Sequence, residues 1–383
     1  MLIWMVVAFV FILGPVMFIH ELGHFWAAKR KGIPVEEFGF GLGPKLVTLF
    51  ERDGTEYTIR AIPFAAFVRM SGEHESGAQG GLMDASRRSK LTVFIAGPAM
   101  NIGATLVLLW IGYLFGPPGF TRVAVAEVNP NSPAEMAGLR ADDVILWADE
   151  IQIETTNDLA AYTADRLGVP MMLTVDREGQ VIDLEVIPRA EGEYDPAVEG
   201  PMGILMRVQA GPPAPENPVK ATGSAMKDFR GQVEMIISFP SMLIRAAQVS
   251  AEKGDTGEML LPQEDIRNFR PVGIVGILQL MAFTLQTGVT EGYIFYIFQT
   301  AALISMALGV TNLLPIPGLD GGHIFFVALD WLSEKILKRR ISPEKEMLFH
   351  AVGLMFLLLL MVVITWQDII NPLIVFPTPT PTP

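Results

Sequence analysis

Long apolar stretches alternate with charged segments along this chain of 383 residues. A helix that crosses a bilayer needs about 20 predominantly apolar residues, and four segments meet that requirement. The first has no basic residues before it and exceeds the apolar core of a signal peptide, which is about 7–15 residues long, so we expect it to be retained. The predicted spans are Leu2–Ala28, Leu91–Phe115, Tyr293–Leu314 and Met347–Trp366.

Two regions between the spans have shorter, strand-like patterns. Residues 35–72 are expected to form a β-hairpin near the membrane, because β-rich stretches flank Asp53-Gly54, a dipeptide favoured in tight turns. Residues 121–208 alternate β-branched runs with turn signals and predict a small α/β domain. Within this domain, Asn131-Ser132-Pro133 is typical of a helix start.

The region after this domain predicts a linker followed by an amphipathic helix at about 226–249. That helix could lie on the membrane surface or pack against the soluble domain, and the pattern leaves both arrangements open. The Pro/Thr tail is expected to be extended and of low complexity. The predicted division is a membrane core at 1–116, the α/β domain at 121–208, the linker and surface region at 209–292, a second membrane core at 293–370 and the tail at 371–383.

Composition and charge agree with a membrane protein. Only 18% of the residues are charged, against about 25% in soluble domains. The net charge of −13 falls in residues 117–292, which hold 26 acidic and 13 basic residues. Nucleic-acid binding needs basic patches and is not expected. Basic clusters at 29–31, 87–90 and 335–340 all become cytoplasmic if both termini and the acidic region lie outside.

The first span carries His20-Glu21-Leu22-Gly23-His24, which matches H-E-x-x-H. Residues four apart share a helix face, so both imidazoles can meet one zinc ion while Glu21 acts beside them as a general base. Ionisable residues inside a span are costly and therefore indicate function. As an alternative, these side chains could anchor the helix end at the headgroups, but anchoring does not explain the spacing of the histidines.

A catalytic zinc ion usually has three protein ligands. His74 lies in a polar loop and His350 opens the last span, so neither is obviously placed to be the third. Asp320 lies in a stretch rich in Pro and Gly that runs from Asn312 to Gly322. Irregular backbone at membrane depth is tolerated where it lines a wet cavity. Asp320 is therefore either a ligand or the capping residue of an interfacial loop, and the residues alone do not decide.

With these two motifs the chain resembles the site-2 protease family of intramembrane zinc metalloproteases, and its bacterial members most of all. The family carries H-E-x-x-H in its first core helix and N-x-x-P-x-P-x-x-D-G in its third, and both occur here in that order. Segments Gly39–Pro44, Gly97–Asn101 and Pro271–Ile274 are also similar to family segments. The resemblance covers nearly the whole chain.

The resemblance implies that His20, His24 and Asp320 bind Zn²⁺ and that Glu21 is the general base. Asn312 stands where the family has an Asn that assists substrate binding or the oxyanion. The implied activity is cleavage of single-span membrane proteins, such as anti-sigma factors or remnant signal peptides, in the bacterial inner membrane. A substrate would add as a strand to the hairpin.

The external domain resembles a bacterial PDZ domain, which implies binding of peptide C-termini. Asp142 departs from that pattern, which often has Gly there. The expected fold class is a polytopic α-helical membrane protein with four transmembrane helices, a membrane-associated β-hairpin and an inserted extracytoplasmic α/β PDZ domain. The matching segments are Ser132–Ala134, Ala137–Leu139, Asp143–Ile145 and Gly203–Leu205.

Two other functions compete with proteolysis. A non-enzymatic membrane adaptor would bind C-termini with its PDZ-like domain, and its metal would be structural or absent. A metal transporter would need further ligands in several spans. The intact H-E-x-x-H motif favours the protease over the adaptor, and few other His, Asp or Glu residues occur inside the spans to form a metal pathway.

Overall fold

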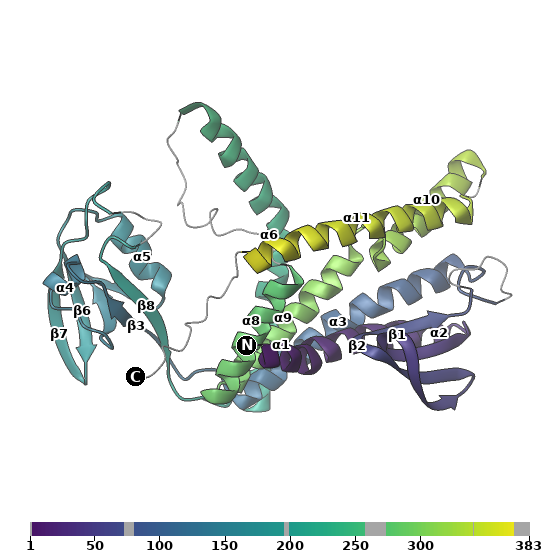
Figure 1. The fold of residues 1–383 in the computed structure, drawn as a ribbon, viewed down its shortest axis with the longest axis horizontal. Coiled ribbons are helices and arrows are strands. Elements are labelled where there is room, and N and C mark those ends of the chain that lie inside the picture. Colours follow the sequence, from purple (N-terminus) through teal and green to yellow (C-terminus); the bar gives the residue numbers. More distant parts are fainter. Residues whose placement is uncertain (1, 73–79, 195–198, 257–272, 340, 371–383) are drawn as a thin grey trace. The chain divides into compact units, whose positions relative to one another are not determined.

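The structure, a computed structural model, describes residues 2–72, 80–194, 199–256, 273–339 and 341–370. The chain forms two compact units. The membrane unit comprises Met1–Phe115 and Pro215–Pro383, and the inserted unit comprises Gly116–Ala214 (Figure 1). His74 and the tail at 371–383 lie outside the described residues.

Among the described residues, four helices of the membrane unit are long and apolar enough to cross a bilayer, which confirms the four predicted spans. The first is continuous from Leu2 to Arg30 and contains a π-helical turn between its two α-helical parts. Three further helices accompany the spans. The helices are α1 (Leu2–Ala8), α2 (Gly14–Arg30), α3 (Arg87–Phe115), α6 (Pro218–Thr256), α8 (Ile274–Thr290), α9 (Ile294–Leu313), α10 (Asp320–Leu337) and α11 (Pro343–Ile370).

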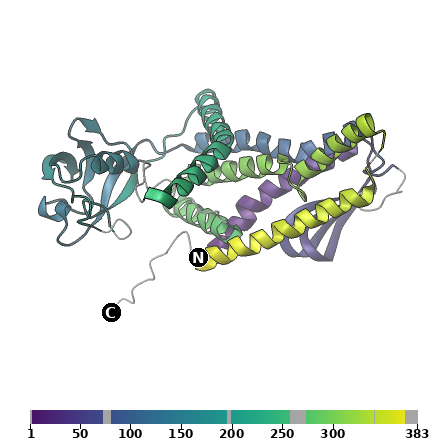
Figure 2. The same cartoon turned by 90° about the horizontal axis from the view of Figure 1, so that it is seen from above.

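Helix α3 is the centre of the membrane unit, because it packs against α2, α6, α9 and α10. Figure 2 shows α3 and α9 running side by side. The approach of α2 to α3 depends on Gly23, where a Cβ atom would lie 2.4 Å from the carbonyl oxygen of Ala96. Small residues at such contacts let helix backbones approach closely in an apolar environment.

Helix α8 was not predicted from the sequence. Its 17 residues fall short of the about 20 that a spanning helix needs, and they lie in the region expected to hold a linker and a surface helix. Met281 and Leu285 of α8 are buried against Ala8 and Ile12 of the first span. This apolar helix therefore belongs to the core of the membrane unit.

The helix predicted at about 226–249 is present as part of α6, and the first residues of α6 pack against α3. Ala225 is buried against Leu109 of α3, with Phe229 packed on the same cluster. The hydroxyl of Tyr113 in α3 donates a hydrogen bond to Asp228 at 2.7 Å. The beginning of α6 is thus fixed to the membrane unit itself.

The predicted hairpin is confirmed, with β1 (Val35–Arg52) and β2 (Thr55–Met70) joined at Asp53-Gly54. Both turn residues have positive φ, at 51° and 70°. Both strands bend, so residues 37–40 pair with 66–69 on one side and with 56–59 on the other. Residues 45–52 pair with 55–60, giving a sheet in the order 45–52, 55–60, 35–40, 66–70.

Glycines permit the bend in β1. Gly41 has φ of 100°, and a Cβ atom there would lie 2.7 Å from the carbonyl oxygen of Ile62. At Gly39, a Cβ atom would lie 2.3 Å from the ring of Phe67. The glycine-rich segment noted in the sequence therefore lets β1 turn between residues 40 and 45, so that its two parts pair with opposite sides of residues 55–60. It also lets β2 approach β1 closely.

The inserted unit is an antiparallel sheet in the order β7-β6-β4-β3-β8, with β5 paired to β4. Its alternation of strands and short helices matches the predicted α/β pattern, and Ser132 caps a helix as predicted, accepting from the backbone N–H of Glu135. The elements are β3 (Thr121–Val128), α4 (Pro133–Met136), β4 (Val144–Ala148), β5 (Ile151–Gln152), α5 (Thr156–Ala164), β6 (Met171–Arg177), β7 (Gln180–Val186) and β8 (Ile204–Ala210).

Candidate metal centre and active-site cavity

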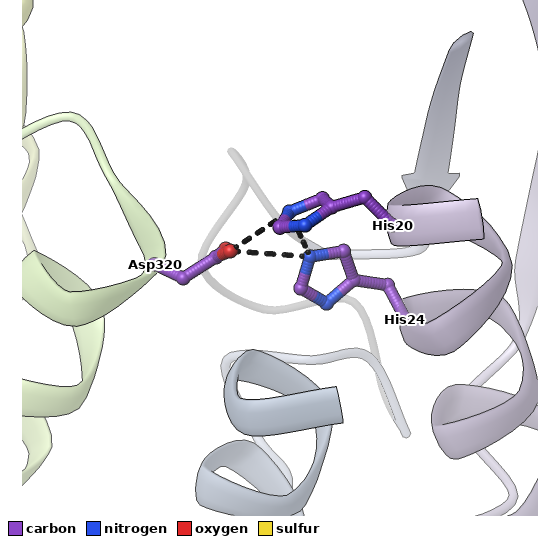
Figure 3. Close-up of side chains that lie close together, drawn as sticks. All are labelled: His20, His24 and Asp320. Atoms are coloured by element: carbon purple, nitrogen blue, oxygen red, sulfur yellow. Dashed lines mark hydrogen bonds and ion pairs between the residues drawn. The ribbon is translucent and has the colours of Figure 1, made fainter. Parts of the chain in front are cut away.

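Three of the predicted site residues meet at one point of the membrane unit. His20 and His24 project from the same face of α2, and Asp320 reaches them from the first turn of α10 (Figure 3). The two histidines are buried, with 7% and 6% of their surfaces exposed, and Asp320 is half-buried. Residues 300 positions apart in sequence thus form one polar cluster.

The three facing atoms form a nearly equilateral triangle. Asp320 Oδ2 lies 3.1 Å from His20 Nε2 and 3.3 Å from His24 Nε2, and the two nitrogens are 3.2 Å apart. A tetrahedral zinc ion with bonds of about 2.0–2.1 Å would hold its ligand atoms about 3.3 Å apart. Two imidazole nitrogens and one carboxylate oxygen at this spacing fit three ligands of a catalytic zinc ion, with a fourth position left for a reactant.

Two glycines make room for the histidines. Gly23 lets α2 approach α3, as described above. At Gly97 of α3, a Cβ atom would lie 2.3 Å from Nε2 of His24 and 2.6 Å from its Cε1. The imidazole of His24 therefore occupies the space that any side chain at Gly97 would need.

The Pro-rich stretch after α9 delivers Asp320. Helix α9 ends at Leu313 and α10 begins at Asp320, so the carboxylate also sits at a helix N-terminus. The N–H of Gly318 donates to Nδ1 of His350 at 3.1 Å. Gly353 of α11 leaves space for Pro317, whose Cβ would lie 2.0 Å from an added Cβ. The last span thereby supports the loop that positions Asp320.

The other predicted residues lie at the same cavity, which has a volume of about 340 Å³. Glu21 and Asn312 line it together with the three clustered residues, and Asn312 Nδ2 is 3.5 Å from His20 Nε2. Sequence reasoning did not place Phe67 and Val68 of β2 there, although both line the cavity. Only the fold of the sheet brings them to it.

A buried ion cluster stiffens that sheet. The carboxylate of Glu37, 1% exposed, accepts from the Arg60 guanidinium at 2.8 and 3.0 Å. Burial alone would raise the pKa of Glu37, but hydrogen bonds from Arg60 and Thr58 hold it below its usual value. The guanidinium of Arg60 also lies over the ring of Phe67, 4.7 Å from its centroid. This network fixes the cavity-lining side chain of Phe67.

Helices α10 and α11 carry a second group of potential metal ligands near the loop between α9 and α10. The group consists of His323, Glu346 and His350. The rings of His323 and His350 stack with their centroids 3.7 Å apart and their planes at 14°, so their in-plane lone pairs lie in two nearly parallel planes and do not converge on one ion. Nδ1 of His350 already accepts from the backbone. This group therefore supports the loop and does not form a second metal centre.

A helical membrane unit with two buried histidines, a half-buried aspartate and a glutamate at one cavity defines a membrane-embedded metallohydrolase. The model of peptidase family M50 matches residues 8–360. The chain belongs to peptidase family M50, the site-2 protease family, and is a zinc metalloprotease.

Named relatives agree with this assignment. Metalloprotease MmpA of Caulobacter vibrioides is 30% identical over 95% of both chains. Zinc metalloprotease RasP of Oceanobacillus iheyensis is 28% identical over 95% of this chain and 98% of its own. A putative zinc metalloprotease of Clostridium acetobutylicum is 27% identical over 94% of this chain and 96% of its own. The similarity therefore extends over both units.

The substitution Gly97→Ala should weaken zinc binding, because its Cβ would displace the imidazole of His24. Metal–ligand distances tolerate changes of only about 0.2 Å. We expect zinc retention against a competing chelator to fall by at least about tenfold, measured as metal content after dialysis. Gly103→Ala is the matched control, because it lies on the same helix with nothing within 4 Å of its Cβ. Equal retention in the two variants would contradict the role of Gly97.

Proposed function

We propose that this protein is an intramembrane endopeptidase that holds zinc with His20, His24 and Asp320 and cuts the membrane segments of single-span proteins, such as anti-sigma factors or remnant signal peptides. The observation that carries this proposal is the triangle of ligand atoms with edges of 3.1–3.3 Å. It lies in a cavity among helices long enough to cross a bilayer. Membership of peptidase family M50 supports the same chemistry.

The residues around the triangle divide the remaining work of peptide hydrolysis. Zinc, when bound, supplies positive charge that activates water and polarises a carbonyl group. Glu21 is the general base, taking a proton from the attacking water and passing it to the leaving amine nitrogen. The amide of Asn312 lines the cavity and can donate a hydrogen bond to the carbonyl oxygen of the scissile bond.

The edge of the sheet is suited to present a substrate in extended form. Residues 66–69 pair with 37–40 on one side, and no strand of the described chain pairs with their other side. Phe67 and Val68 of this edge line the cavity. A substrate strand added there would bring its backbone to the metal centre, since strand addition exposes main-chain groups in register.

We also infer that the inserted unit is a PDZ domain on the extracytoplasmic side of a bacterial inner membrane. The three basic clusters support this orientation, since basic loops stay cytoplasmic. Its sheet with two short helices is compatible with such a domain. There it would bind peptide C-termini and act as a filter between a substrate's external domain and the cavity.

Glu21→Gln should retain zinc but lose cleavage, because an amide cannot accept the proton. General base catalysis contributes about 10²- to 10⁴-fold, so cleavage of tagged single-span substrates in membranes should fall by that factor. His20→Ala/His24→Ala should lose both zinc and cleavage. Full zinc content in the double variant would defeat the ligand assignment, and undiminished cleavage by Glu21→Gln would defeat the role of Glu21.

Proline at whichever of positions 67 and 68 directs its N–H to the free edge should lower cleavage of every substrate. Alternate residues of a strand direct their N–H groups to opposite sides, so this change removes one donor to an added strand and leaves the pairing with residues 37–40 in place. A backbone hydrogen bond contributes about 0.5–1.5 kcal/mol, so kcat/KM should fall by about 2- to 10-fold. Leu49→Pro is the control, because residues 45–52 form the opposite edge of the sheet. An effect confined to some substrates would argue for side-chain recognition at this edge.

Deletion of residues 121–208 should preserve cleavage of short, pre-trimmed substrates and admit untrimmed ones. The ratio of trimmed to untrimmed substrate cleaved is the measurement, and an unchanged ratio would refute the filter. Loss of all cleavage would show a recruiting or structural role instead. A reporter fused after Pro117 should show the outside location that the filter requires.

A further inference from the structure

Asn101 is a fully buried polar residue next to the metal centre that the proposed mechanism leaves without a role. It lies on α3, one turn beyond Gly97, with 0% of its surface exposed. Its Nδ2 atom is 3.3 Å from Nδ1 of His20. Its Oδ1 atom is buried with no hydrogen-bond partner among the described residues. Polar groups buried in a membrane protein are normally paired, so this arrangement needs a reason.

The proposed metal centre places a demand on His20. A neutral imidazole carries one proton, so Nε2 can offer a lone pair to zinc only when Nδ1 holds that proton. His24 meets the same demand, since its Nδ1 donates to the carbonyl oxygen of Val93 at 2.8 Å. Zinc-binding histidines generally donate their second ring N–H to a carbonyl or carboxylate oxygen. Nδ1–H of His20 therefore needs an acceptor, whereas Nδ2 of Asn101 is a second donor.

Rotating the Asn101 side-chain amide by a half-turn about its last side-chain bond exchanges the positions of its oxygen and nitrogen. The Nδ1–H of His20 then faces an acceptor and no longer a second donor. We propose that Asn101 presents Oδ1 to Nδ1–H of His20 and thereby holds His20 in the tautomer and orientation that can bind zinc through Nε2. This inference rests on the proposed ligand set. It makes Asn101 a positioning residue, which acts on the metal only through His20.

The backbone around Asn101 is suited to that role because it is fixed at the contact between α3 and α9. The carbonyl oxygen of Asn101 accepts hydrogen bonds from Ser305 at 2.9 Å and from Thr105 at 3.0 Å. At Gly309 of α9, an added Cβ would lie 3.3 Å from Cβ of Asn101. The side-chain amide thus extends toward His20 from a backbone held by two helices.

Three variants of the full chain test this inference through zinc retention against graded chelator. Asn101→Leu keeps the approximate size but removes the acceptor, and it should bind zinc about 10- to 100-fold more weakly. Asn101→Asp offers an acceptor in either orientation and should retain zinc like the parent. Gly103→Ala is the control on the same helix, because nothing lies within 4 Å of its added Cβ, and it should also match the parent.

A role in packing alone predicts the opposite order, because leucine suits a buried apolar site and a carboxylate does not. The inference is overturned if Asn101→Leu holds zinc as tightly as the parent, or if Asn101→Asp loses it to the same extent as Asn101→Leu. Thermal unfolding of the zinc-free proteins separates misfolding from a specific loss of metal. Zinc retained by His20→Ala/His24→Ala would instead show that the ligand set is wrong, which is a different failure.

Discussion

The contact that governs the membrane unit is the meeting of two imidazoles and one carboxylate within 3.3 Å inside a mostly apolar set of helices. Bringing such groups out of water is costly unless each is paired or binds a metal. The surrounding helices must therefore hold α2 and the start of α10 in fixed register. The contacts of α3 with α2, α9 and α10 serve this requirement directly.

Close backbone approach is how the unit achieves this register. Gly23 and Gly97 bring α2 and α3 together around His24, and Gly353 lets α11 seat the loop before Asp320. Without a hydrophobic driving force between helices in lipid, van der Waals packing and buried hydrogen bonds must fix their positions. A methyl group at any of these sites would therefore shift the helices or the loop that position the metal centre, although none of these glycines can bind a metal.

Local patterns were sufficient to predict the four spans, the turn at Asp53-Gly54 and the placement of His20 and His24 on one helix face. They left Asp320 undecided, because only the folded chain brings α10 to α2. They also missed the second pairing of residues 37–40 with 66–69, since strand register depends on long-range contacts. Asn101 could have been identified from the sequence, because it is a polar residue inside an apolar span and such residues indicate function.

The hydrogen bonding of a helix constrains the form in which a membrane substrate could be cut. A helix pairs its backbone N–H and C=O groups internally, so it does not present an accessible peptide bond to the metal centre. A membrane segment that is cut there must therefore unwind, which breaks its internal hydrogen bonds in surroundings where each unpaired group costs about 2–7 kcal/mol. The free edge at residues 66–69 offers replacement partners beside the cavity. On this view, the sheet lowers the cost of unwinding at the place where the chain is cut.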